Sequence, residues 1–89
     1  MVVFVFSKFA DKRLKKLARS EQDRIIIKLQ ELKQHPDVLS ILKPLHNFEP
    51  ATHRLRVGNY RLILQLIQTS SHQEEFIVLD VGHRRDIYR

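Results

Sequence analysis

The chain has 89 residues, which is enough for one domain and too few for an enzyme with separate cofactor and substrate domains. Its 43% hydrophobic content suffices for a modest core, and two glycines and three prolines are too few for a linker-rich or low-complexity chain. Sixteen Lys and Arg against ten Asp and Glu give a net charge of +6, which favours nucleic acid, an anionic membrane surface or an acidic protein as partner. Cysteine is absent, which excludes disulfides and thiolate metal sites and makes the cytoplasm the expected compartment.

A strand and two helices are predicted in the first third of the chain. Val and Phe dominate Met1–Phe6, which predicts a buried strand too short to cross a membrane. Ser7 offers an N-cap for a helix over Lys8–Ala18. Ser20 opens a sequence similar to a capping box, which predicts a second helix over Glu21–Gln34 and therefore a helical hairpin.

The rest of the chain is predicted to form a meander of strands. Two prolines mark Asp37–Ala51 as a connector. The hydrophobic period then changes to two, which predicts strands over Thr52–Val57, Tyr60–Gln68 and Glu75–Val81. We therefore expect one α+β domain over residues 1–89, in the order β-α-α-β-β-β. The helical hairpin should pack on one face of a mainly antiparallel four-stranded sheet.

The Gly58–Asn59 turn fixes the register of the predicted hairpin, so that Arg56 faces Arg61. Alternation then puts a core face on one side, made of Leu55, Val57, Tyr60, Leu62 and Leu64. The other face holds Arg54, Arg56, Arg61, Ile63 and Gln65. Two opposite arginines cost roughly a few tenths to 1 kcal/mol, and the hairpin contains no acid to relieve them. Three guanidiniums on one face suit phosphate, although a solvated face that only provides solubility is the alternative.

The residues after the last predicted strand are also basic. They are His83, Arg84, Arg85, Tyr88 and Arg89, with Asp86 as the lone acid. Because the last strand should pair with Tyr60–Gln68, this tail can lie beside the arginine face. Charges for the backbone and a ring that stacks on a base are what RNA binding requires. The alternative for Tyr88 is an anchor packed on the core together with Ile87.

Two motifs, RLRVGNYR over Arg54–Arg61 and VGHRRDIY over Val81–Tyr88, resemble the RelE/ParE toxin superfamily, and more its RelE branch. The resemblance covers essentially the whole chain. It implies the toxin of a type II toxin–antitoxin pair. The RelE branch enters the ribosomal A site and cleaves mRNA there, whereas the ParE branch poisons DNA gyrase and generally lacks the ribonuclease residues. The implied partners are a cognate antitoxin, the ribosome and mRNA, with no membrane.

The resemblance also implies functional positions. They are Arg54, Arg56, Arg61, Arg84 and Tyr88, with His83 where some relatives have a histidine; the first two are lysine in the best-known relatives. The implied reaction is metal-independent attack by the RNA's own 2′-OH, which leaves a cyclic phosphate. Arg61 and Arg84 suit stabilisation of the developing phosphorane, Tyr88 suits the base, and His83 is the candidate acid, or else a structural hydrogen-bonding group. RNA-binding roles are expected for Arg54, Arg56, Arg85 and Arg89.

The remaining histidines give no sign of a metal site. His35, His46, His53 and His72 are scattered, without metal-ligand spacing, and we expect neither a metal nor a small-molecule cofactor. His53 should lie on the core face near Leu64 as a packing residue. Two other functions stay open: a ParE-like gyrase inhibitor without nuclease activity, and an inactive protein that only binds the antitoxin.

Overall fold

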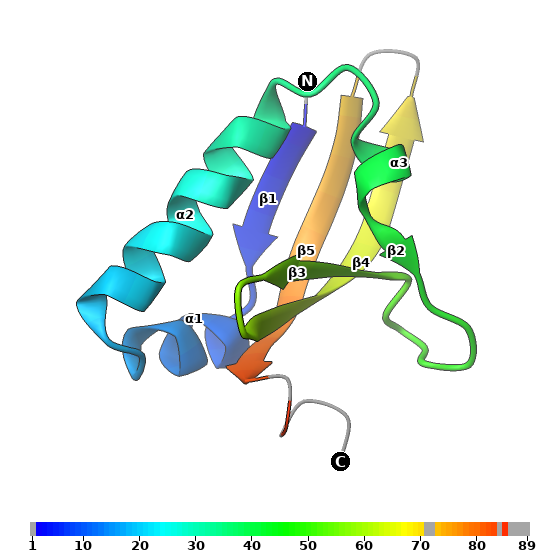
Figure 1. Ribbon diagram of the computed structural model, residues 1–89. Helices are drawn as coiled ribbons and strands as arrows, with labels where there is room; N and C mark the ends of the chain where they lie inside the picture. The colour runs from blue at the N-terminus through cyan, green and yellow to red at the C-terminus, as the bar shows by residue number, and fades with distance from the viewer. Residues whose placement is uncertain (1, 71–72, 84, 86–89) are drawn as a thin grey trace.

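The computed structural model describes residues 2–70, 73–83 and 85 (Figure 1). Its elements in chain order are β1 (Val2–Phe6), α1 (Lys8–Lys15), α2 (Arg19–Lys33), α3 (Val38–Ile41), β2 (Lys43–Pro44), β3 (His53–Val57), β4 (Tyr60–Ser70) and β5 (Gln73–His83). The strands form one sheet in the order β1-β5-β4-β3-β2. Only β1 and β5 run parallel among these pairs, so the predicted α+β class with a mainly antiparallel sheet is confirmed.

The predicted strand number, four, is wrong by one, because the connector contains α3 and the two-residue strand β2. Lys43 and Pro44 pair with Arg54 and His53 at the edge of the sheet. Pro44 lacks an N–H, and such residues are tolerated at sheet edges. A strand this short, containing a proline, leaves no periodic signal in a sequence.

The helical hairpin is confirmed, but its corner lies earlier than predicted. Ser7 caps α1 as expected, because its Oγ accepts a hydrogen bond from the Ala10 N–H at 3.1 Å. The predicted capping box is wrong: Ala18 is the N-cap of α2, and Ser20 lies inside the first turn. The side-chain amide of Gln22 donates to the Leu17 carbonyl at 2.9 Å. This hydrogen bond satisfies a carbonyl between the two helices and favours the start of α2 at Arg19.

The core lies between the helices and one face of the sheet. α2 buries Ile25, Leu29 and Leu32, and the facing sheet residues Leu62, Leu64, Phe76 and Val78 are fully buried. The ring of Phe4 on β1 stacks on Phe76 with centroids 5.5 Å apart. Among the described residues, no helix is long and apolar enough to cross a membrane.

Two irregularities in the β4–β5 pairing change which side chains share a face. The register shifts between Ile63 and Leu64 and again between Leu66 and Gln68. β4 and β5 are also longer than the predicted ranges 60–68 and 75–81. Such bulges increase the local twist. In Figure 1 β3 and the first part of β4 lie across β5, and their turn lies on the side of α2.

Candidate nucleic-acid interface

The β3–β4 hairpin has the predicted register. Val57 pairs with Tyr60, Arg56 with Arg61 and Arg54 with Ile63. Gly58 has φ +59°, which the first position of a hairpin turn of this kind requires and which glycine adopts without strain. The predicted core face is confirmed, since Leu55, Val57, Leu62 and Leu64 are all buried.

On the other face, the three predicted arginines line one hollow of about 180 Å³. Its lining residues are Ile41, Lys43, Arg54, Arg56 and Arg61. They come from α3, β2, β3 and β4, so segments separated in the sequence contribute to one site. The sequence reasoning missed Ile41 and Lys43, because only the β2–β3 pairing brings the connector to this edge.

Cations in this hollow face one another across neighbouring strands. Arg56 lies directly opposite Arg61, and Lys43 lies directly opposite Arg54. Like charges in such positions are destabilising. Arg56 Nε donates to the Gly58 carbonyl at 3.4 Å, and Arg61 Nη1 donates to the Tyr60 carbonyl at 3.5 Å. These long contacts with carbonyls leave the positive charges of both arginines available to a ligand.

The carboxylates of the described residues do not neutralise Arg56 or Arg61. Within the described part of the chain, neither arginine belongs to an ion pair. Asp80, which pairs in register with Ile63 on the adjacent strand, accepts from Val81 N–H at 2.8 Å and lies 3.4 Å from Arg13 Nε. Cations therefore line the hollow, and their chemistry suits an anion with several oxygens, such as phosphate.

The structure puts His83 on the opposite face of the sheet from the hairpin arginines. His83 pairs with Tyr60, and the two rings meet edge to face with centroids 5.7 Å apart. Tyr60 packs against the core on the helix face, so strand alternation puts His83 there too and Arg61 on the opposite face. Gly82, which has no side chain, pairs with Arg61.

The remaining tail residues are described only in part. Arg85 is exposed, and its N–H donates to His83 Nδ1 at 3.2 Å. Arg84, Tyr88 and Arg89 lie outside the described residues.

His53 has the packing role that the sequence predicts. It pairs with Leu64, its ring meets Phe76 edge to face at 5.9 Å, and its Nδ1 lies 2.9 Å from Thr52 Oγ1. Burial lowers the pKa of His53 below 6.5, because desolvation disfavours the charged ring. Among residues 2–70, 73–83 and 85, no three His, Asp or Glu side chains gather as metal ligands would.

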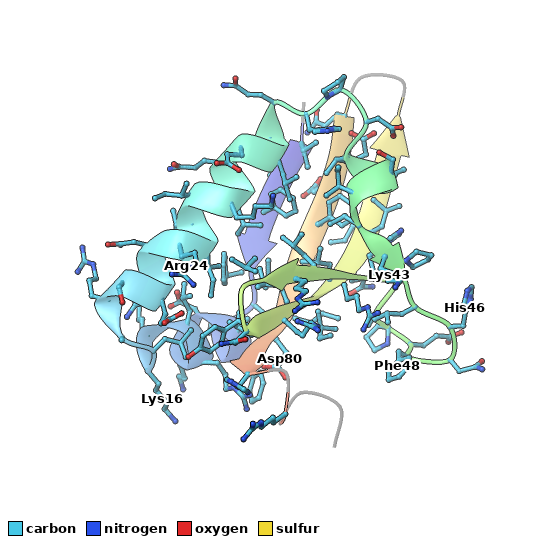
Figure 2. All side chains as sticks on the ribbon, in the orientation of Figure 1. Lys16, Arg24, Lys43, His46, Phe48 and Asp80 are labelled. Carbon is cyan, nitrogen blue, oxygen red and sulfur yellow. The ribbon has the colours of Figure 1, made fainter. Side chains whose placement is uncertain are left out.

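A larger and mainly apolar hollow of about 500 Å³ lies on the helix side of the hairpin. Ile27 and Val57 provide apolar surface, and two cations, Arg24 and Lys28, and two acids, Asp23 and Glu31, surround it. Ile27 is 55% exposed, unusual for an isoleucine in a helix that packs on a sheet. Figure 2 shows Arg24 on α2 beside the hairpin, and a Cβ at Gly58 would lie 3.0 Å from its Nη1.

Three solved structures share this fold over nearly the whole chain. The RelBE2 toxin–antitoxin complex of Mycobacterium tuberculosis aligns with a TM-score of 0.71 and 26% identity over 94% of this chain and 92% of that one. The RelB–RelE antitoxin–toxin complex of Methanococcus jannaschii aligns with a TM-score of 0.63 and 26% identity over 94% of both chains. The isolated RelE toxin of E. coli aligns with a TM-score of 0.60 and 25% identity over 97% of this chain and 89% of that one.

A comparison with curated proteins finds no match. The family described as the ParE toxin of the type II toxin–antitoxin system parDE matches residues 4–88. This match covers every element of the fold except the first residues of β1. The chain therefore belongs to the ParE toxin family of type II toxin–antitoxin systems, within the RelE/ParE superfamily.

Proposed function

We propose that this toxin is a metal-independent endoribonuclease that cleaves mRNA in the ribosomal A site and so inhibits translation in the cytoplasm. The observation that supports it is the single hollow lined by Arg54, Arg56 and Arg61. Nothing in the packing of a small domain calls for three guanidiniums on one sheet face, and their mutual repulsion costs stability. A phosphodiester backbone would offset that repulsion.

In the proposed reaction the 2′-oxygen attacks the neighbouring phosphorus, and the bond to the 5′-oxygen breaks. A cyclic phosphate remains, and the leaving 5′-oxygen takes a proton from water to become a 5′-hydroxyl. Arg61 stabilises the charge of the phosphorane, while Arg54 and Arg56 hold the backbone. From the resemblance to RelE, we assign to Arg84 a second contact that stabilises the phosphorane, and to Tyr88 the removal of the 2′-OH proton. Arg85 and Arg89 bind RNA. We give His83 no catalytic role, because its ring packs against Tyr60 on the helix face.

A cognate antitoxin is the proposed protein partner. Two of the solved neighbours are complexes of a toxin with its antitoxin. The apolar hollow beside α2, lined by Ile27 and Val57, suits an amphipathic segment whose apolar side chains enter it. The ribosome is the second proposed partner, since a hollow of about 180 Å³ contacts too little RNA to hold a message firmly without it.

Purified protein added to a translating extract tests the proposal, with the mRNA ends mapped. We expect cuts in ribosome-bound message and none in naked RNA. Arg61→Ala should lower the cleavage rate by about 10²–10³-fold, the usual loss for one transition-state contact, and Tyr88→Phe should also lower it sharply. The matched control is Arg19→Ala, an exposed arginine on α2 whose ion pair with Asp23 is on the surface. His83→Gln should retain cleavage.

A ParE-like gyrase inhibitor is the second candidate, because the matched family is that of the ParE toxins. It predicts a different outcome from the same variants. If expression of Arg61→Ala and Tyr88→Phe still stops growth, and chromosomal DNA breaks accompany the arrest, the gyrase function is correct and the nuclease proposal is wrong. Growth that continues with the unmodified chain would instead identify an inactive antitoxin-binding protein.

A further inference from the structure

The connector contributes two residues to the arginine hollow, and neither belongs to the motifs that suggested RNA cleavage. Lys43 begins β2 and pairs with Arg54, so its ammonium lies on the arginine face. Ile41 ends α3, is 45% exposed and lines the same hollow. Figure 2 shows Lys43 at the β2 edge of the sheet, with Lys16 far from it at the end of α1.

The charge of Lys43 costs stability without an ion pair to offset the cost. The residue is exposed, and its ammonium forms no ion pair with the described residues. It faces a guanidinium across β2 and β3, and the Arg56–Arg61 pair lies beside this one. Two neighbouring like-charged pairs on one face make a stronger positive field than the arginines of the hairpin alone.

The hollow is also wider than one phosphate. Lys43 and Arg61 lie on β2 and β4, with β3 between them. Two strand spacings separate their backbones by roughly 10 Å, and Arg54 and Arg56 occupy the middle. A single strand crossing the sheet would bring one phosphate to Arg61 and the next toward Lys43. The apolar side chain of Ile41 then lies beside the strand's path at the β2 edge.

We propose that Lys43 and Ile41 form a second nucleotide subsite next to the cleavage position. Lys43 is a positioning residue that binds the phosphate adjoining the one held by Arg61. Ile41 packs against the ribose or base of that nucleotide. The inference rests on the proposed ribonuclease function and extends it from one phosphate to at least two nucleotides of bound RNA.

The test measures binding of a short single-stranded RNA, 2′-O-methylated so that it cannot be cut, by fluorescence anisotropy over a series of salt concentrations. Each lost phosphate contact lowers the slope of log K against log salt by about 0.7. Lys43→Ala should show this decrease and bind roughly three- to tenfold more weakly at moderate salt. Lys43→Arg should restore both, and Lys16→Ala, with the same charge change, should leave the slope unchanged.

Ile41 gives an independent signature. Ile41→Ser should weaken binding roughly two- to fivefold at every salt concentration without changing the slope, because an apolar contact releases no counterions. The matched control is Ile26→Ser, an exposed isoleucine on α2. A change in slope for Ile41→Ser, or equal weakening by Ile26→Ser, would overturn its assignment.

Cleavage in the translating extract separates this inference from the proposed function. Lys43→Ala should raise the ribosome concentration needed for the half-maximal rate and leave the maximal rate unchanged. If Arg61→Ala abolishes cleavage but Lys43→Ala behaves like Lys16→Ala, the subsite is wrong and the nuclease stands. If the unmodified chain neither binds RNA nor cuts message, both proposals fall together.

Discussion

Replacing Arg56 by Glu should stabilise the fold and reduce its activity. Arg56 lies directly opposite Arg61, so the change converts a repulsive cross-strand pair into an attractive one. The matched control is Arg56→Gln, which removes the repulsion without adding an attraction. Both variants lose the 3.4 Å contact to the Gly58 carbonyl. Cross-strand charge pairs are worth roughly 0.2–1 kcal/mol, so Glu should exceed Gln by about that amount.

Relative to the unmodified chain, Arg56→Glu should gain about 0.5–1.5 kcal/mol, because it ends one repulsion and adds one attraction. For a chain of this length that is an increase of about 2–12 °C in Tm. Urea unfolding followed by circular dichroism measures it, and the difference between Glu and Gln should shrink near 1 M salt, where the Debye length is about 3 Å. The mRNA cleavage of Arg56→Glu should fall meanwhile. A Glu variant less stable than Gln, or a difference that salt does not change, would refute the electrostatic reasoning.

Three further changes test the fold around the site. Gly58→Ala should cost about 1–2 kcal/mol in urea unfolding, because φ is +59° and the added Cβ would lie 3.0 Å from Arg24; an unchanged midpoint would contradict that turn geometry. Burial lowers the pKa of His53, so the folded state binds fewer protons than the unfolded state. The free energy of unfolding therefore decreases as pH falls from about 6.5 toward the pKa of the folded state. His53→Gln should flatten the pH dependence of stability in that window, the exposed His46→Gln should not, and equal slopes in both would reject the assignment. Leu62→Ala should cost about 2–5 kcal/mol, since Leu62 is fully buried, and a loss below 1 kcal/mol would mean that the core is looser than described.

The arginine face was predictable because its determinants are local. A two-residue turn fixes hairpin register, and a one-residue error would have moved every side chain to the opposite face. Val57, Gly58 and Tyr60 therefore sufficed to place Arg56 opposite Arg61. The helical hairpin was predictable for a similar reason, since Ser7 and the spacing of Ile25, Leu29 and Leu32 are signals within one element.

The rest of the site depends on tertiary pairing that the sequence does not reveal. Lys43 reaches the hollow because a two-residue strand pairs with β3, and no periodicity indicates such a strand. The face of the sheet on which His83 lies follows from its pairing with Tyr60. Two register shifts between β4 and β5 precede this pair, and the sequence does not indicate them. The corner at Ala18 depends on the amide of Gln22 reaching back to α1, which competes with a capping signal at Ser20.

The place of β5 in the sheet has a consequence for synthesis. β5 lies between β1 and β4, and Val2 pairs with Glu74. During synthesis β1 therefore cannot pair in the sheet until β5 has been made. Contacts this distant in sequence form late and favour slow folding. A chain that is interrupted before residue 73 leaves β1 unpaired and β4 with an open edge beside Arg61. Such a chain lacks the strand that supports β4, so we expect it neither to assemble the surface that we propose binds RNA nor to arrest growth.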